Sequence, residues 1–155
     1  MITFKKILFC NDFSESAKWA FPYALELAKL HDGKIYILHI VPETDRYLFG
    51  YSLPEDLKNQ IEQEQKKKIE EGFKETCIEQ MGDFKNYEFI IKEGDVPFIE
   101  ILEFAKENDV DIIVMGTHGR TGLTHVLFGS TAENVVRKSS CPVLTVRHPE
   151  RKLKL

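Results

Sequence analysis

The stretch Asp111-Ile-Ile-Val-Met-Gly-Thr-His-Gly-Arg-Thr-Gly122 decides the fold of this chain. Its first part is a run of large apolar side chains, Ile112 to Met115, between Asp111 and Gly116. A run without polar alternation is typical of a strand that is buried on both faces of a parallel sheet. We therefore expect a strand at 111–115 and, around it, an α/β fold.

A glycine-bearing loop follows this strand and leads into a helix. Gly116, Gly119 and Gly129 are positions where a backbone without a Cβ atom can turn sharply or come close to a ligand. A helix is expected from Ser130 to Lys138, and Ser130 and Glu133 have the spacing of a capping box. The amide groups of a helix's first turn and its partial positive charge attract anions, so this arrangement predicts a phosphate site.

Strands and helices alternate along the rest of the chain. Apolar runs predict further strands at 5–10, 34–41, 87–92 and 142–147. Helices are expected at about 15–31, from a Ser52–Glu55 capping box to about 81, and after an Asp95 cap with Pro97 in the first turn. This alternation implies a single, open, doubly wound sheet of five mostly parallel strands with helices on both faces. The first, second and fourth strands are the most apolar and should be central, whereas the alternation at 87–92 suits an edge.

Three helices carry more detailed expectations. Pro22 interrupts the first helix and predicts a kink or a late start of the regular helix. The long helix should turn one apolar stripe toward the sheet, formed by Leu53, Leu57, Ile61, Ile69, Phe73 and Cys77. The helix that follows the third strand should have an inner face of Val96, Ile99, Leu102 and Ala105.

Length, charge and cysteine usage exclude several classes of protein. The 155 residues fit one domain, which we place at 1–147, with a polar tail at 148–155. The net charge of −4 argues against a general binder of nucleic acids or membrane surfaces, which needs a positive excess. We expect neither a signal peptide nor a membrane-spanning segment. Cys10, Cys77 and Cys141 form no disulfide framework or metal motif, so a reducing cytoplasm is the expected location.

Other phosphate-binding motifs are missing from the sequence. No Walker string G-x4-G-K-[ST] occurs. The first strand is followed by Asn11-Asp12-Phe13-Ser14 and not by the dinucleotide fingerprint G-x-G-x-x-G or the pyrophosphatase string S-G-G-x-D-S. The loop after the fourth strand is therefore the main phosphate candidate.

The glycines of this loop also carry a family resemblance. The spacing of three glycines resembles the ATP-binding signature G-x2-G-x9-G-[ST] of the universal stress protein family. In this chain two residues separate Gly116 from Gly119, and nine separate Gly119 from Gly129-Ser130. The sequence from Asp111 to Arg120 is also similar to that of family members, and the resemblance extends from Lys5 to Arg147. The resemblance implies a Rossmann-like fold of the adenine nucleotide alpha hydrolase type with strand order 3-2-1-4-5. In such a sheet the ligand crevice lies between the first and fourth strands, beyond their C-terminal ends.

The resemblance further implies that ATP, or ADP or AMP, binds in this crevice. Asp12 would accept hydrogen bonds from the ribose hydroxyls or the base amine, although capping a turn is an alternative role for an aspartate there. Ile40 and Val41 would contact the adenine, unless they are plain core residues. Ser130 and Thr131 would offer hydroxyls to the phosphates, Arg120 would neutralise their charge, and His118 would either assist or orient the loop. The implied binding set is Cys10, Asn11, Asp12, Ile40, Val41, Met115, Gly116, His118, Gly119, Arg120, Gly129, Ser130, Thr131 and Ala132.

The site residues predict little chemistry beyond binding. His118 and His125 have no third ligand at a recognisable spacing, so no metal site from side chains is expected. Any Mg²⁺ or Mn²⁺ would be held mainly by the phosphates of the nucleotide. The loop contains no lysine and no evident base for rapid phosphoryl transfer, which leaves at most slow ATP hydrolysis.

The last strand suggests a partner. Val143, Leu144, Thr145 and Val146 form an apolar strand at a sheet edge, where the family commonly builds a two-fold dimer. The chain is therefore expected to be a cytoplasmic, homodimeric stress-response regulator in which the nucleotide tunes the surface for a partner protein. A nucleotide-independent interaction dimer and a slow ATPase are the alternatives.

Overall fold

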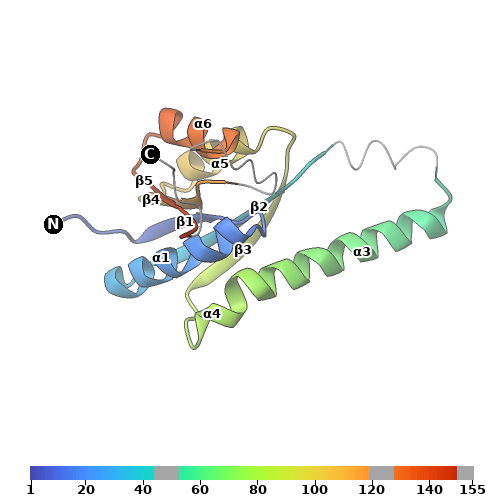
Figure 1. Cartoon of the computed structure of the whole chain (residues 1–155), viewed down its shortest axis with the longest axis horizontal. Helices are drawn as coiled ribbons and strands as arrows, with labels where there is room; N and C mark the ends of the chain where they lie inside the picture. The colour runs from blue at the N-terminus through green and yellow to red at the C-terminus, as the bar shows by residue number, and fades with distance from the viewer. Residues whose placement is uncertain (44–52, 119–127, 150–155) are drawn as a thin grey trace.

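The computed structural model of the chain describes residues 1–43, 53–118 and 128–149 (Figure 1). Five strands form one sheet in the order β3-β2-β1-β4-β5, and every neighbouring pair is parallel. Both the doubly wound architecture and the predicted strand order are confirmed. The strands are β1 (Lys6–Cys10), β2 (Lys34–Val41), β3 (Tyr87–Glu93), β4 (Ile112–Gly116) and β5 (Val143–Val146).

Helices lie on both faces of this sheet. One face is covered by α1 (Glu15–His31), the π-helical segment η1 (Lys74–Ile78) and α4 (Glu79–Met81). The segments η1 and α4 directly follow α3 (Glu55–Phe73) in the chain. The other face is covered by α5 (Pro97–Glu107) and α6 (Ser130–Lys138). No helix within the three described ranges is long and apolar enough to cross a membrane.

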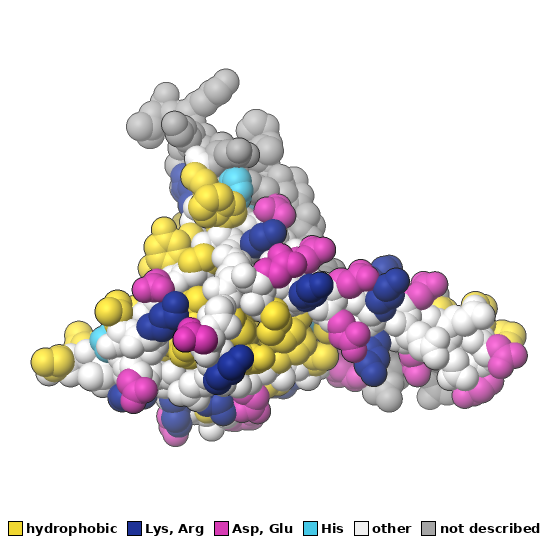
Figure 2. Space-filling model, turned by 90° about the horizontal axis from the view of Figure 1, so that it is seen from below, with side chains coloured by type: hydrophobic (Ala, Val, Ile, Leu, Met, Phe, Trp, Pro, Cys, Tyr) yellow, Lys and Arg dark blue, Asp and Glu magenta, His cyan; other side chains and the backbone are white. Residues whose placement is uncertain are grey.

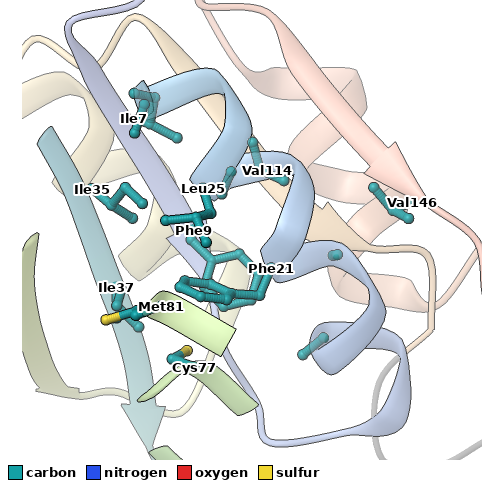
Figure 3. Packing of buried hydrophobic residues seen from close by; sticks show 14 of the residues in the cluster. Ile7, Phe9, Phe21, Leu25, Ile35, Ile37, Cys77, Met81, Val114 and Val146 are labelled. Carbon is teal, nitrogen blue, oxygen red and sulfur yellow. The ribbon is translucent and has the colours of Figure 1, made fainter. Parts of the chain in front are cut away.

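The two layers of core explain why the central strands are apolar throughout. Successive side chains of a strand point to opposite faces of the sheet. Accordingly, Ile7 and Phe9 of β1 pack under α1, whereas Leu8 between them packs under α5 and α6. In the first layer the Phe21 ring of α1 meets the Phe9 ring edge-on, at a centroid distance of 5.1 Å (Figure 3). A polar residue at any of these positions would be buried without water, so β1 has no polar alternation.

The long helix was placed wrongly in its first part. No residue of α3 is buried, and the helix runs away from the sheet (Figure 1), with acidic and basic side chains along its length (Figure 2). Leu57, predicted to face the sheet, is 40% exposed. The stripe reaches the sheet at Phe73, whose ring stacks on the Phe89 ring of β3 at a centroid distance of 4.1 Å. Cys77 and Met81 continue it into the core.

Two predicted helix caps were wrong, and a third falls partly outside the described residues. Ser130 is the first helical residue, because Gly129 occupies the N-cap position of α6 without a side-chain cap. Helix α5 is capped by Val96 and not by Asp95, since Pro97 at the first helical position fixes the start. Helix α3 starts at Glu55 with Pro54 as its N-cap and no side-chain cap, and Ser52 of the predicted capping box lies outside the described residues.

Two further expectations about helix interiors need correction. Helix α1 starts at once after its N-cap Ser14, so Pro22 does not delay it. On α5 the buried residues are Ile101 and Ala105, whereas Val96 and Ile99 are 42% and 41% exposed. The later start of the helix, at Pro97, turns the inner face away from Val96.

Candidate functional site

A crevice lies where the C-terminal ends of β1, β2 and β4 meet the start of α6. It is the switch point of the sheet, because the chain leaves β1 toward α1 on one face and β4 toward α6 on the other. Its volume of about 310 Å³ is in the range of small-molecule sites. The residues that line it are Cys10, Asn11, Asp12, Ser14, Ala17, Leu38, His39, Ile40, Pro42, Pro97, Ile101, Met115, Gly116, Thr117, His118, Gly129, Ser130, Thr131 and Ala132.

The turn after β1 is held by hydrogen bonds at each of its residues. The Asn11 amide donates to the Leu38 carbonyl at 2.9 Å, and the Asn11 side-chain oxygen accepts from the Phe13 amide at 3.0 Å. Asp12 Oδ1 accepts from the Ser14 amide at 3.0 Å, and Ser14 Oγ caps α1 by accepting from the Ala17 amide at 3.2 Å. Asp12 therefore fills the turn-capping role considered from the sequence, and its carboxylate is held at the wall of the crevice.

Phe13 fixes this turn against the rest of the molecule. It has a positive φ of 63°, which is uncommon for a residue with a bulky side chain. Its ring stacks on the His39 ring at 4.1 Å, and His39 Nδ1 lies 2.8 Å from the Asn11 carbonyl oxygen. Because a carbonyl can only accept, Nδ1 carries the proton in this bond. The Phe13 ring also packs against Gly72 of α3. A Cβ atom at position 72 would lie 2.5 Å from Phe13 Cγ.

The start of α6 forms the opposite wall. Its first intrahelical bond runs from the Glu133 amide to the Gly129 carbonyl at 3.0 Å, so the amides of Ser130, Thr131 and Ala132 have no acceptor within the helix. Among the described residues no side chain caps them, and all three residues line the crevice. The Gly129 amide donates to the Thr117 carbonyl at 2.7 Å, which ties the start of α6 to the end of β4. This wall offers several N–H donors and the positive end of a helix to an anion.

Gly116 allows close packing beneath the crevice. A Cβ at this position would lie 2.7 Å from Ser16 Cβ and 2.8 Å from the Ser16 backbone carbon. The first turn of α1 can therefore approach the end of β4 only because residue 116 is a glycine. The sequence suggested a close approach to a ligand at Gly116, whereas its close neighbour in the structure is Ser16 of α1.

His118 and Cys10 are two of the polar side chains that line the crevice. His118 is buried, and its Nδ1 lies 2.9 Å from Thr117 Oγ1. Burial raises the pKa of the Cys10 thiol far above its usual value, and the neighbouring Asp12 carboxylate and Cys141 thiol raise it further. A raised pKa keeps the Cys10 thiol protonated at physiological pH, which disfavours a role as nucleophile.

The structure brings most of the predicted binding residues together. The crevice is lined by Cys10, Asn11, Asp12, Ile40, Met115, Gly116, His118, Gly129, Ser130, Thr131 and Ala132. Val41 is not among the lining residues, and its carbonyl accepts from the Gly94 amide at 2.9 Å. Gly119 and Arg120 lie outside the described residues. In the part of the chain that is described, no three His, Cys, Asp or Glu side chains are grouped so that they could hold a metal ion.

The sequence-based analysis missed several residues of the site. Thr117 stands between two predicted residues and could have been included from its position alone. His39 directly precedes Ile40 on β2 and was not considered in the sequence analysis. Pro97 and Ile101 come from α5, and no local pattern links this helix to the glycine loop.

Comparisons with known proteins identify relatives over nearly the whole chain. A family model described as the universal stress protein family matches residues 3–147. Universal stress protein MJ0577 of Methanocaldococcus jannaschii is 35% identical over 94% of this chain and 96% of the relative. Universal stress protein MJ0531 of the same organism is 36% identical over 96% of this chain and 85% of the relative.

Solved structures give the same picture. The structure of MJ0577, presented as a structure-based assignment of biochemical function, matches with a TM-score of 0.73 and 38% identity, and covers 95% of this chain and 98% of that one. A universal stress protein in complex with cAMP has a TM-score of 0.60 and 20% identity, with coverage of 94% and 98%. The Archaeoglobus fulgidus universal stress protein in complex with dAMP has a TM-score of 0.54 and 22% identity, with coverage of 94% and 98%. At identities of 20% and 22%, the likeness to these last two structures shows the shared fold alone.

The contact between Gly72 and Phe13 gives a test in which the sign of the effect is decisive. In an isolated helix, Gly→Ala stabilises by about 1 kcal/mol. Here we expect Gly72→Ala to lower the free energy of unfolding by about 1 to 3 kcal/mol, because the new methyl group would overlap the Phe13 ring. Urea denaturation followed by circular dichroism measures the change. The exposed neighbour Glu70 provides a control, and Glu70→Ala should stay within about 0.5 kcal/mol of the parent. A stabilised Gly72→Ala variant would contradict the contact.

Proposed function

Because this chain belongs to the universal stress protein family, we propose that it binds an adenine nucleotide, ATP in the first place, in the crevice between β1 and β4. The observation that carries the proposal is the uncapped start of α6, whose first amides line the same crevice as the Asp12 carboxylate. One wall thus suits phosphates and the other suits the hydroxyls of a ribose. The complexes of two fold relatives with cAMP and dAMP support an adenine nucleotide as the ligand.

The phosphate group would be held by donors from β4 and α6. The amides and hydroxyls of Ser130 and Thr131 and the amide of Ala132 provide hydrogen bonds, and Gly129 leaves the entrance to the helix end without a side chain. His118 adds a ring that orients the end of β4 through Thr117. In this proposal Gly119 and Arg120, both outside the described residues, complete the phosphate side, with Arg120 neutralising charge.

The adenosine would lie toward β1 and β2. A carboxylate offers about four acceptor sites, which is more than the bond from the Ser14 amide requires. The same Asp12 group can therefore hold the turn and accept a ribose hydroxyl. Cys10, Asn11, Ile40 and Met115 form the neighbouring wall for the sugar and base, and we retain Val41 as a contact beyond the crevice rim.

The role of the nucleotide in this proposal is regulatory. The donors at α6 bind and orient phosphates, and any Mg²⁺ or Mn²⁺ would be coordinated mainly by the phosphates themselves. We propose that the chain is a cytoplasmic stress-response protein whose bound nucleotide tunes its surface for a partner protein. Slow hydrolysis of ATP and nucleotide-independent interaction remain the alternative functions.

We further propose that the protein is a homodimer through β5, the edge strand with Val143, Leu144, Thr145 and Val146. The carbonyls of Pro142 and Val146 accept from β4, at 3.0 Å each. Because backbone groups alternate along a strand, the N–H and C=O groups of Val143 and Thr145 point to the open edge. An antiparallel copy of β5 would pair with these groups across a two-fold axis.

Nucleotide binding can be tested by titration calorimetry with ATP and magnesium. Asp12→Ala should weaken ATP binding roughly tenfold to hundredfold, the value of hydrogen bonds to a charged group. Asp12→Asn keeps the acceptor for the Ser14 amide, so it separates loss of the turn from loss of the charge. The exposed Asp83, remote from the crevice, serves as the control, and Asp83→Ala should bind like the parent. Absence of binding by the folded parent at millimolar ATP would refute the proposal.

Dimerisation through β5 can be tested by removing one outward amide. Thr145→Pro removes the N–H that points to the open edge, while proline at an edge position is compatible with the strand. We expect this variant to sediment as a monomer at concentrations where the parent is a dimer. Thr145→Val keeps the amide and should remain a dimer. A dimeric Thr145→Pro variant would exclude pairing of β5 with itself.

A further inference from the structure

Helix α1 has a second apolar face that the domain does not cover. Its buried face is formed by Ala17, Ala20, Phe21, Ala24, Leu25 and Ala28. On the opposite side Trp19, Tyr23 and Leu30 are 46%, 52% and 77% exposed. A helix at the surface of a monomer normally turns polar residues to water, and a helix that is apolar on both sides is normally covered on both. The second face of α1 therefore has the composition of a contact surface.

This face borders an apolar hollow beside β5. The hollow has a volume of about 490 Å³ and is lined by Trp19, Pro22, Tyr23, Glu26, Leu27, Leu30 and Leu144. Leu144 contributes from β5, the strand at the open edge of the sheet. Hydrophobic side chains reach the surface on this side of the molecule between the charged ones (Figure 2). The hollow thus adjoins the edge at which backbone groups point outward.

The charges around the hollow do not oppose its burial. Of the described residues that line it, Glu26 is the only acidic or basic one, and its Oε1 lies 3.4 Å from Lys29 Nζ on the same helix. Trp19, one of the residues that line the hollow, contacts His148: the two rings pack edge-on at a centroid distance of 5.2 Å. Among the described residues, covering this surface would therefore bury an existing ion pair at its rim.

We propose that the hollow is occupied by a second copy of this chain, with Trp19, Tyr23 and Leu30 packing against the same face of the partner's α1. The inference rests on the proposed pairing of β5. A two-fold axis perpendicular to the sheet makes the two β5 strands antiparallel neighbours in one continuous sheet and puts both α1 helices on the same face of it. The two hollows then share a floor, formed by Leu144 from each copy, with one α1 on either side.

The side chains suit this role. Tryptophan and tyrosine are enriched among the residues that contribute most to binding, since they bury a large area with few rotatable bonds. The strand pairing supplies backbone hydrogen bonds at the edge, and the α1 faces supply the apolar contact that backbone pairing lacks. The geometry makes α1 a part of the interface equal in importance to β5.

The experiment uses the natural fluorescence of the full chain. Trp19 is the only tryptophan, so emission reports on this surface alone. We expect dilution from a dimer to a monomer, followed in parallel by analytical ultracentrifugation, to shift the emission to longer wavelength and to increase acrylamide quenching. Tyr23→Glu should raise the dimer dissociation constant at least about tenfold, because it places carboxylates in an apolar contact.

A matched control places the same charge elsewhere. Leu57 of α3 is also a partly exposed apolar residue, and Leu57→Glu should leave the dissociation constant unchanged. Circular dichroism of both variants verifies that the fold is intact. A parent dimer whose Trp19 emission does not change on dilution, together with an unchanged constant for Tyr23→Glu, would overturn the inference while leaving the pairing of β5 intact. A parent that stays monomeric at all concentrations would overturn both.

Discussion

The parallel pairing of β1 with β4 is the constraint on which the rest of the structure depends. Ile7, Leu8 and Phe9 stand beside Ile112, Ile113 and Val114, although more than 100 residues separate the two strands. Because both strands run the same way, their C-terminal ends open at the same edge, and the chain leaves them for opposite faces of the sheet. The crevice is the space between these two departures, so its position follows from the pairing and not from any local motif.

The walls of the crevice are held in different ways. The turn after β1 is fixed by its own hydrogen bonds and by Phe13, which is pressed between His39 and Gly72. Gly72 belongs to the last turn of α3, directly before η1, and Asn11 Nδ2 donates to Cys77 Sγ of η1 at 3.4 Å. The projecting helix thus joins the domain at the turn that carries Asp12. The α6 wall depends on Gly129, which starts the helix and leaves its amides available to a ligand.

Sequence was sufficient for the features that depend on the period of apolar residues. The five strands and the central place of β1, β2 and β4 follow from buried apolar runs. The full strand order came from the family resemblance, and the crevice between Asp12 and Ser130 from that order and the glycine positions. The errors lie where competing local rules apply: proline at 97 overrode the Asp95 cap, and Gly129 displaced Ser130. The projection of α3 could not be foreseen, because helical periodicity shows which side of a helix is apolar but not whether a surface lies beneath it.

The central claim is that the amides at the start of α6, which have no acceptor within the helix, hold the phosphates of an adenine nucleotide. Nuclear magnetic resonance of the ¹⁵N-labelled protein tests it directly, by titration with ATP and, separately, with adenosine. ATP should shift the amide signals of Ser130, Thr131 and Ala132, whereas adenosine should shift those of Asn11 and Asp12 and leave the α6 signals nearly unchanged. If saturating ATP shifted other signals and left the three α6 amides in place, the phosphate site would lie elsewhere and the account would be wrong.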